Sequence, residues 1–287
     1  MSKTLDQLVG QLIIAGFRND KVTDSSNISA YIKKYNLSGV ILYDEDLEKN
    51  GPGTRNIKSP DQVKDLTNTL QSISEAPLFI SIDQEGGHVN RLKTSYGFPE
   101  FPSWKHIGAI DNTLITKEFA SSISETMVNT GINLNFAPVL DLDYGEKTYI
   151  GKLERGLSGD HKNVIEHSKI FIETLRNNNI ISCGKHFPGQ GSAFGDTHQG
   201  LIDISDSWSV ADLLPYAELI ESDHLDMVMV SHVFNDKFDP EYPASLSHET
   251  ITNSLRKDLN FNGVVTVSYT HLRAHETLRY LGWRGLR

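Results

Sequence analysis

The 287-residue chain has very little cysteine and no long apolar segment. Its single cysteine, Cys183, excludes an internal disulfide and is typical of a reducing compartment, so we expect a cytoplasmic location. No apolar run approaches the roughly 20 residues needed to cross a bilayer. The N-terminal residues lack the apolar core of a secretion signal. We therefore expect neither a membrane association nor a leader peptide.

Positive charge is also scarce. The chain has 27 Lys and Arg against 37 Asp and Glu, which gives a formal net charge of -10. Nucleic-acid binding depends on a basic surface that faces the phosphates, so this balance argues against a nucleic-acid partner. It says little about small-molecule ligands, because local charge decides their binding.

What the chain does have is a regular alternation of short apolar, β-branched segments with segments of helical period. Strands are expected at residues 12–17, 39–43, 78–83, 132–136, 180–185, 227–231 and 263–265. Helices are expected near residues 59–73, 113–129, 162–177, 209–222 and 248–258. The first of these helices starts with Ser59 as N-cap, Pro60 at the first helical position and Gln62 at the capping-box position. This alternation predicts an α/β fold with a parallel sheet.

Several of the expected strands end in polar residues, and this favours a (β/α)8 TIM-type barrel over a doubly wound sheet. Examples are Asp83, the segment 138–141, the pair Lys185 and His186, and the pair Ser231 and His232. Seven strands are found where a barrel needs eight. We therefore predict one domain, residues 1–265, that is a barrel truncated after about its seventh strand.

The segment IDQEGGHVNRL at residues 82–92 places Asp83 at a strand end, before a Gly-Gly turn. The glycines let the backbone approach a ligand closely. Asp83 can accept two hydroxyl hydrogen bonds, and Arg91 can donate to another group. A structural Asp–Arg pair under a loop is the competing interpretation.

The segment GKHFPGQGSAFGDTH at residues 184–198 is more informative. Lys185 and His186 close a buried strand, and a glycine-rich loop follows that can move over a ligand. Asp196 and His198 can pair in a tight turn, and a carboxylate partner suits a histidine to proton transfer. His186, Asp196 and His198 are also competent metal ligands, but their spacing is wider than in most zinc sites. We expect no metal and no cofactor.

Three other positions carry weaker signals. Asp141 ends an alternating segment, and strand-end carboxylates both contact ligands and anchor loops. Glu154 and Arg155, with Asp160 further on, have the pattern of a surface charge pair. His232 at a strand end is as consistent with a structural histidine as with a pocket residue.

These segments, in this order, resemble the family 3 glycoside hydrolases of the β-N-acetylhexosaminidase type. The matching text is IDQEGGHVNRL, GINLNFAPVLDLD, KHFPGQGSAFGDTH, MVMVSHV and YPASLS, followed by LRKDLNFNGVV. The resemblance covers nearly all of residues 10–265. It implies a barrel that releases terminal β-linked N-acetylglucosamine from peptidoglycan fragments or chitooligosaccharides, through a covalent glycosyl-enzyme.

The resemblance also assigns roles to individual residues. It implies that His198 is the acid/base, with Asp196 as its partner. It implies that the sugar is bound by Asp83, Arg91, Arg155, Lys185 and His186. A histidine acid/base is unusual, because most glycosidases use two carboxylates. Two positions depart from the family pattern: His88 stands where Arg is frequent, and Gln190 where His is frequent. We expect both to affect the pocket rim.

The largest departure follows Val265. The family continues there with an Asp that acts as the nucleophile, whereas Ser268 occupies the position in this chain. A serine without an adjacent base is a poor replacement. The segment VSYTHLRAHET from Val267 resembles a translated sequencing adapter, so we interpret residues 266–287 as a non-native tail. An open barrel edge then remains. We expect the chain as written to be unstable and inactive.

Two other functions remain open from the sequence. One is a family 3 β-glucosidase or glycoside phosphorylase on the same barrel. The other, from a different class, is a non-catalytic sugar-binding protein, which the missing nucleophile superficially supports. In each case the expected partner is a small oligosaccharide or muropeptide, and we expect a monomer.

Overall fold

The computed structural model describes residues 3–46, 51, 53–197 and 200–267. Two compact units are distinguished by their internal contacts. The first comprises Met1–Pro138 with Glu166–Cys183, and the second comprises Val139–Ile165 with Gly184–Arg287.

Seven strands occur in the described part of the chain, and they follow one another across the sheet in sequence order. They are β1 (Ile14–Gly16), β2 (Gly39–Leu42), β3 (Phe79–Ile82), β4 (Leu134–Asn135), β5 (Ile181–Phe187), β6 (Met227–Val230) and β7 (Val264–Val267). A doubly wound sheet reverses its strand order at a switch point, whereas a barrel does not. The predicted α/β fold of barrel type is confirmed, with seven strands in the residues described.

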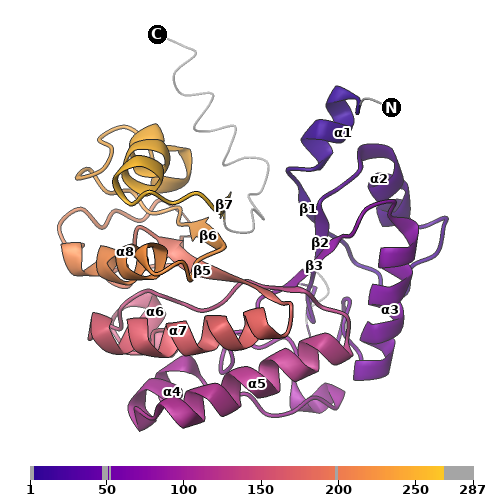
Figure 1. The fold of residues 1–287 in the computed structure, drawn as a ribbon, viewed down its shortest axis with the longest axis horizontal. Helices are drawn as coiled ribbons and strands as arrows, with labels where there is room; N and C mark the ends of the chain where they lie inside the picture. The colour runs from indigo at the N-terminus through magenta and orange to yellow at the C-terminus, as the bar shows by residue number, and fades with distance from the viewer. Residues whose placement is uncertain (1–2, 47–50, 52, 198–199, 268–287) are drawn as a thin grey trace. The chain divides into compact units, whose positions relative to one another are not determined.

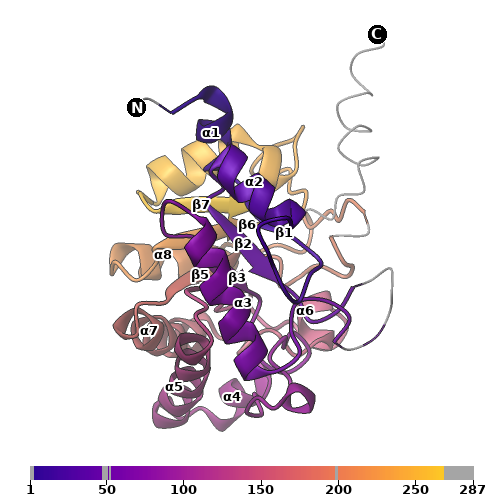
Figure 2. The ribbon, with the colours of Figure 1, turned by 90° about the vertical axis from the view of Figure 1, so that its right-hand side faces the viewer.

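The first unit contains the parallel pairs β1–β2, β2–β3, β3–β4 and β4–β5. Helices α2 (Asn27–Tyr35) and α3 (Pro60–Ile73) lie side by side next to β1–β3 (Figures 1 and 2). The unit also contains α1 (Leu5–Gly10), the 3-10 turn η1 (Thr94–Tyr96), α4 (Trp104–Ile110) and α5 (Thr113–Asn129). Most of α7 (His161–Asn177) belongs to it as well.

Aromatic packing joins the helices of the first unit. Trp104 of α4 stacks on Phe119 of α5 with ring centroids 6.0 Å apart, and it meets Phe171 of α7 edge-on at 5.5 Å. All three rings are buried. Aromatic pairs of this geometry stabilise a core beyond the area that they bury. The apolar positions of α5 and α7 therefore face one shared cluster.

The second unit contains the end of β5, together with β6 and β7, which pair in parallel. Its helical segments are α6 (Tyr149–Lys152), η2 (Val210–Leu213), α8 (Leu214–Glu221), η3 (Ala244–Leu246) and the π-helix η4 (Glu249–Asp258). A buried cluster of Ala193, Ile204, Trp208, Val230 and Val233 fills its centre. This cluster anchors the segment that follows β5 on the strand β6.

The helix predicted from Ser59 is present, but its cap differs in one detail. Ser59 accepts the N–H of Gln62 at 3.2 Å, as expected for an N-cap. The amide oxygen of Gln62 accepts the N–H of Lys58 at 2.8 Å, one residue before the N-cap. The Gln62 amide nitrogen donates to the carbonyls of Asp20 and Asn56. Gln62 thus joins two loops to α3 rather than closing a capping box.

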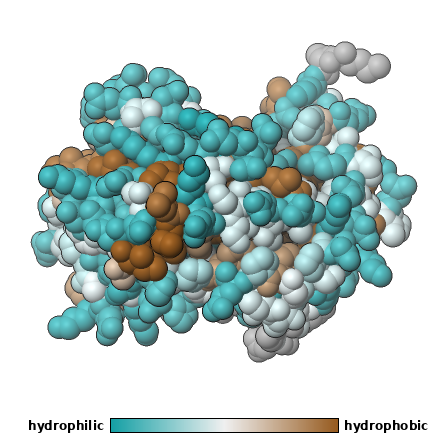
Figure 3. Space-filling model, turned by 60° about the horizontal axis from the view of Figure 1, so that its bottom comes forward, coloured by the Kyte–Doolittle hydropathy of each residue, from teal (hydrophilic) through white to brown (hydrophobic). Residues whose placement is uncertain are grey.

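The face shown in Figure 3 is largely polar, with apolar side chains gathered in a patch on the left of the view. Large exposed apolar residues include Ile110 and Leu114, where α4 and α5 meet. Among the residues that the structure describes, no helix has the length and apolar character needed to cross a membrane.

Candidate functional site

The loop after β3 is shaped by its two glycines, but for a different reason than expected. Gly86 and Gly87 both have positive φ, at 90° and 57°. A Cβ at Gly86 would lie 2.2 Å from the carbonyl oxygen of Pro102, and one at Gly87 would lie 2.6 Å from the Ser103 Cβ. The close approach is therefore to the chain's own segment 102–103. Asp83, directly after β3, is partly exposed at the start of this loop.

The backbone of Arg91 is fixed by Gln84. The Gln84 amide oxygen accepts the N–H groups of Arg91 and Leu92, each at 3.1 Å. The N–H of Gln84 in turn donates to Asn135 at the end of β4, at 3.0 Å. Gln84 is fully buried, so this connection is shielded from water. The loop therefore presents Arg91 at a defined place relative to β3 and β4.

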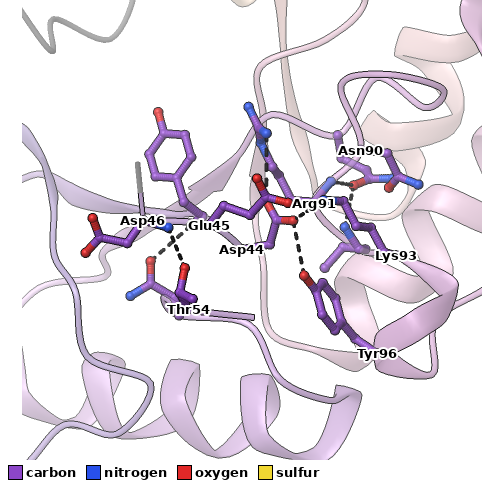
Figure 4. Close-up of polar contacts among 12 residues, drawn as sticks. Asp44, Glu45, Asp46, Thr54, Asn90, Arg91, Lys93 and Tyr96 are labelled. Carbon is purple, nitrogen blue, oxygen red and sulfur yellow. Dashed lines mark hydrogen bonds and ion pairs between the residues drawn. The ribbon is translucent and has the colours of Figure 1, made fainter. Parts of the chain in front are cut away.

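The Arg91 side chain has partners that the sequence analysis missed (Figure 4). Its guanidinium lies 3.7 Å from the carboxylate of Asp44, which follows β2, and 5.4 Å from the centre of the Tyr43 ring. Lys93 contacts both Asp44, at 2.6 Å, and Glu45, at 2.7 Å. A polar residue directly after a predicted strand was the available signal for Asp44, since sites in barrels gather at strand ends.

The charges of this cluster affect one another's protonation. Burial works against the charged form of Lys93, but the carboxylates of Asp44 and Glu45 outweigh it and raise the Lys93 pKa. Burial raises the pKa of Tyr96, and the negative charge of Asp44 adds to this effect. At neutral pH the cluster therefore contains a charged lysine and a neutral tyrosine.

In the second unit, a buried chain of hydrogen bonds runs from Asp141 through His186 to Arg155. Nδ1 of His186 lies 2.6 Å from Oδ2 of Asp141, and Nε2 lies 3.2 Å from Nη2 of Arg155. All three residues are buried. A guanidinium only donates, so Nε2 of His186 accepts and Nδ1 carries the proton to Asp141. The contacts therefore specify one neutral tautomer of His186.

The electrostatics agree with a neutral imidazole. Burial is the main reason that the pKa of His186 is lowered, and the nearby cations of Arg155 and Lys185 lower it further. The charge of Asp141 acts in the opposite direction without reversing the shift. The spacing of residues 154–160 taken alone suggested a surface charge pair, but Arg155 is buried against His186. Asp160, the distant member of that pattern, instead accepts the N–H of Lys162 at 2.9 Å in the first turn of α7.

The two departures from the family pattern lie in different environments. Gln190 is buried: its N–H donates to Asp141 at 2.8 Å, and its side-chain oxygen accepts the hydroxyl of Ser231 at 2.6 Å. These bonds join the segment after β5 to Asp141, which follows β4, and to Ser231, which follows β6. The effect of Gln190 on the pocket rim stays a prediction. His88 is exposed in the turn after β3.

A second buried carboxylate, Asp212, lies next to the glycine-rich loop. Tyr144 donates its hydroxyl to Asp212 at 3.2 Å, and the N–H of Ser209 donates at 3.0 Å. Burial raises the pKa of Asp212 to about 6, and the charge of Asp141 contributes. A Cβ on Gly189 would lie 2.5 Å from the Asp212 Cβ, so only glycine fits against this residue.

The other described residues singled out from the sequence lie in or after β5 and β6. Lys185 is buried in β5, where its carbonyl accepts the N–H of Leu140 at 2.7 Å. Asp196 is partly exposed in the loop after β5, and His198 lies outside the described residues. His232 contacts the Ser245 hydroxyl through Nδ1 at 2.7 Å, which fits its structural interpretation. Within the described ranges, no three His, Cys, Asp or Glu side chains cluster as metal ligands.

The sequence of residues 4–278 matches the Glycosyl hydrolase family 3 N terminal domain. The chain belongs to glycoside hydrolase family 3. It is 32% identical over 238 residues to a "Beta-hexosaminidase" of Methylobacillus flagellatus, in an alignment that covers 80% of this chain and 64% of the relative. The chain thus spans less than two thirds of that relative's length.

Solved structures of the family are similar in fold. A glycoside hydrolase family 3 β-N-acetylglucosaminidase from Paenibacillus sp. aligns over 93% of this chain and 49% of its own, with a TM-score of 0.83 and 32% identity. NagZ from Neisseria gonorrhoeae in complex with N-trifluoroacetyl-D-glucosamine aligns over 88% and 73%, with a TM-score of 0.77 and 28% identity. The family match continues past residue 265, so it does not mark the predicted tail boundary.

Proposed function

We propose that this family 3 chain carries the sugar-binding and acid/base parts of a β-N-acetylglucosaminidase. The observation that carries the proposal is the buried chain Asp141–His186–Arg155, built on the KHFPG motif at residues 185–189. It presents an arginine whose orientation is set before any ligand arrives, as expected of a sugar-binding site. The β-hexosaminidase and β-N-acetylglucosaminidase names of the relatives support the choice of sugar.

Sugar hydroxyls are bound by complementary donors and acceptors. In the proposal, Asp83 accepts hydroxyl hydrogen bonds, while Arg91, Arg155 and Lys185 donate them. His186 has both ring nitrogens engaged in this structure, by Asp141 and by Arg155. It therefore acts on the sugar in one of two ways: by holding Arg155, or by exchanging that contact for a hydroxyl when the ligand binds.

Proton transfer is assigned to the loop after β5. His198 serves as the acid/base, first donating a proton to the leaving oxygen and then accepting one from water. Asp196 orients the imidazole and raises its basicity. Both roles rest on the family motif at residues 184–198.

The proposed mechanism retains the anomeric configuration. A carboxylate attacks the anomeric carbon as the leaving oxygen is protonated, and water then releases the sugar from the glycosyl-enzyme. The position of that carboxylate in the family falls on Ser268, which lies outside the described residues. Residues 266–287 remain, in this proposal, a non-native tail, and the chain as written does not complete the reaction.

The proposed substrates are peptidoglycan fragments or chitooligosaccharides that end in β-linked N-acetylglucosamine. We place the protein in the cytoplasm, because its single cysteine, Cys183, is buried and a lone cysteine is typical of a reducing compartment. We also propose a monomer. No observation in the described residues favours a β-glucosidase, a phosphorylase or a non-catalytic binding protein over this function.

The test is to sequence the locus across codon 266, recover the full-length gene and assay its product. We expect an Asp at the position of Ser268, three residues after the Gly-Val-Val segment. We also expect hydrolysis of 4-nitrophenyl N-acetyl-β-glucosaminide that is faster than that of the glucoside and independent of phosphate. A genomic codon run for VSYTHLRAHET would contradict the tail hypothesis. A preference for the glucoside, or a requirement for phosphate, would contradict the assigned function.

A further inference from the structure

The carboxylate of Asp44 is one of the most enclosed charges of the first unit. Asp44 is fully buried two residues after the end of β2, and its side-chain partners come from the segment after β3: Arg91, Lys93 and Tyr96 (Figure 4). A carboxylate removed from water needs nearby positive charge or hydrogen bonds. Asp44 finds both in a segment that also contains a proposed sugar-binding residue.

Two cations share the Asp44 carboxylate unequally. Nζ of Lys93 lies 2.6 Å from Oδ2, whereas Nη1 of Arg91 lies 3.7 Å from Oδ1. The Tyr96 hydroxyl approaches Oδ2 at 3.4 Å. Coulombic attraction weakens with distance, so Lys93 supplies most of the neutralisation. Arg91 is drawn toward Asp44 without forming the short, two-pronged pair that would occupy its donors.

Arg91 is restrained from two other directions. Its backbone N–H donates to Gln84, and its guanidinium lies over the ring of Tyr43. The Arg91 side chain still keeps 26% of its surface exposed, against 1% for Asp44. One side of the guanidinium is thus fixed by protein, and part of the group stays open to a ligand.

From this arrangement we infer that Asp44 is a positioning residue that orients the Arg91 guanidinium for the sugar, and that Lys93 prevents Asp44 from capturing it. The inference rests on the proposed sugar-binding role of Arg91. Asp44 itself is buried and acts through Arg91. The two contacts of Asp44 then have opposite effects. The contact with Arg91 orients the guanidinium, and the contact with Lys93 limits how tightly Asp44 holds it.

The orientation is tested on the full 287-residue chain labelled with 15N-arginine. Spectra are recorded at about 10 °C, near the usual stability maximum, and the Arg91 signals are assigned with Arg91→Lys. We expect separate Nη proton signals for Arg91, because a restrained guanidinium rotates slowly. In Asp44→Asn these signals should average. Glu45→Gln is the matched control, since Glu45 contacts Lys93 at the partly exposed edge, and it should leave Arg91 unchanged.

The consequence for binding is tested by titrating N-acetylglucosamine. Asp44→Asn should weaken the affinity about tenfold, because a charge-assisted hydrogen bond to a misplaced arginine is partly lost. Lys93→Met should weaken it by a similar factor while the Arg91 signals stay separate, because Asp44 then captures Arg91. The double variant Asp44→Asn with Lys93→Met should bind about as weakly as Asp44→Asn alone, rather than about a hundredfold more weakly than the unmodified chain. Without the Asp44 carboxylate, Lys93 no longer affects how Arg91 is held.

Unchanged Arg91 signals in Asp44→Asn would overturn the inference, as would losses of affinity that add in the double variant. A failure of the proposed sugar-binding role of Arg91 would give a different result. If Arg91 loses its order in Asp44→Asn while the affinity for N-acetylglucosamine does not change, the positioning role stands and the sugar-binding role of Arg91 falls.

Discussion

His186 and Asp141 are joined by a buried hydrogen bond of 2.6 Å between Nδ1 and Oδ2, and Asp141 also accepts the backbone N–H of His186 through its other oxygen. The carboxylate thus controls both the ring and the backbone at the end of β5. Nε2 of His186 accepts from Arg155, so a change at Asp141 is transmitted through His186 to Arg155.

Asp141→Asn should therefore weaken N-acetylglucosamine binding by about tenfold or more, since it removes a charge-assisted hydrogen bond that sets the His186 tautomer. Isothermal titration calorimetry measures the affinity. Asp160→Asn is the control, because Asp160 is an exposed carboxylate at the start of α7 in the same unit. Equal affinities for the Asp141 and Asp160 variants would show that the buried chain does not orient the site.

Gly189 offers a prediction about the loop that follows β5. Its φ is 103°, and a Cβ would overlap Asp212 at 2.5 Å, so Gly189→Ala should destabilise the fold by about 2–4 kcal/mol. Gly145 has a similar φ of 91°, but its Cβ would meet nothing within 4 Å. Gly145→Ala should therefore cost only about 1 kcal/mol. Urea unfolding of both variants separates the steric effect from the backbone effect. Equal losses of unfolding free energy in the two variants would contradict a steric overlap between the methyl group added at Gly189 and Asp212.

Asp212 should make stability depend on pH. Burial raises its pKa from an ordinary 3.8 to about 6 in the folded chain. Its contribution to stability is therefore fully present below about pH 3.8 and is lost as the pH rises through about 6. The difference in free energy of unfolding between Asp212→Asn and the unmodified chain should therefore shift by about 2 kcal/mol in favour of the variant from pH 4.5 to pH 7.5. Urea unfolding at both values tests this, with Asp206→Asn, an exposed acid, as the control. The same difference at both pH values would refute the assignment.

Much of the strand pattern could be predicted from the sequence, because buried parallel strands require runs of apolar, β-branched residues. The segment 78–83 shows this, with β3 at Phe79–Ile82 and a polar residue directly after it. The helix predicted at residues 113–129 is also confirmed, as α5. Helices α1, α2, α4 and α6 were not predicted. Only three residues of α2 are buried, Ile28, Ser29 and Ile32, so its apolar pattern is sparse.

The candidate site was predictable to a smaller extent. Motif and strand-end position pointed to His186 and Asp83, because chemistry in a barrel gathers where strands end. The partners were not predictable, because an ion pair such as Asp44 with Lys93 joins residues 49 apart in sequence and depends on the register of neighbouring strands. The spacing of residues 154–160 alone did not distinguish Arg155 from a surface charge, because its burial depends on His186 in β5; only the family resemblance pointed to Arg155.

The measurement that tests the central claim most directly is a calorimetric titration of N-acetylglucosamine and of glucose into the purified 287-residue chain, repeated with Asp83→Asn and Arg155→Met. We predict saturable binding that favours N-acetylglucosamine and is lost in both variants. We also predict that the chain as written does not hydrolyse 4-nitrophenyl N-acetyl-β-glucosaminide. Absence of binding, or binding that both variants keep unchanged, would contradict the central claim.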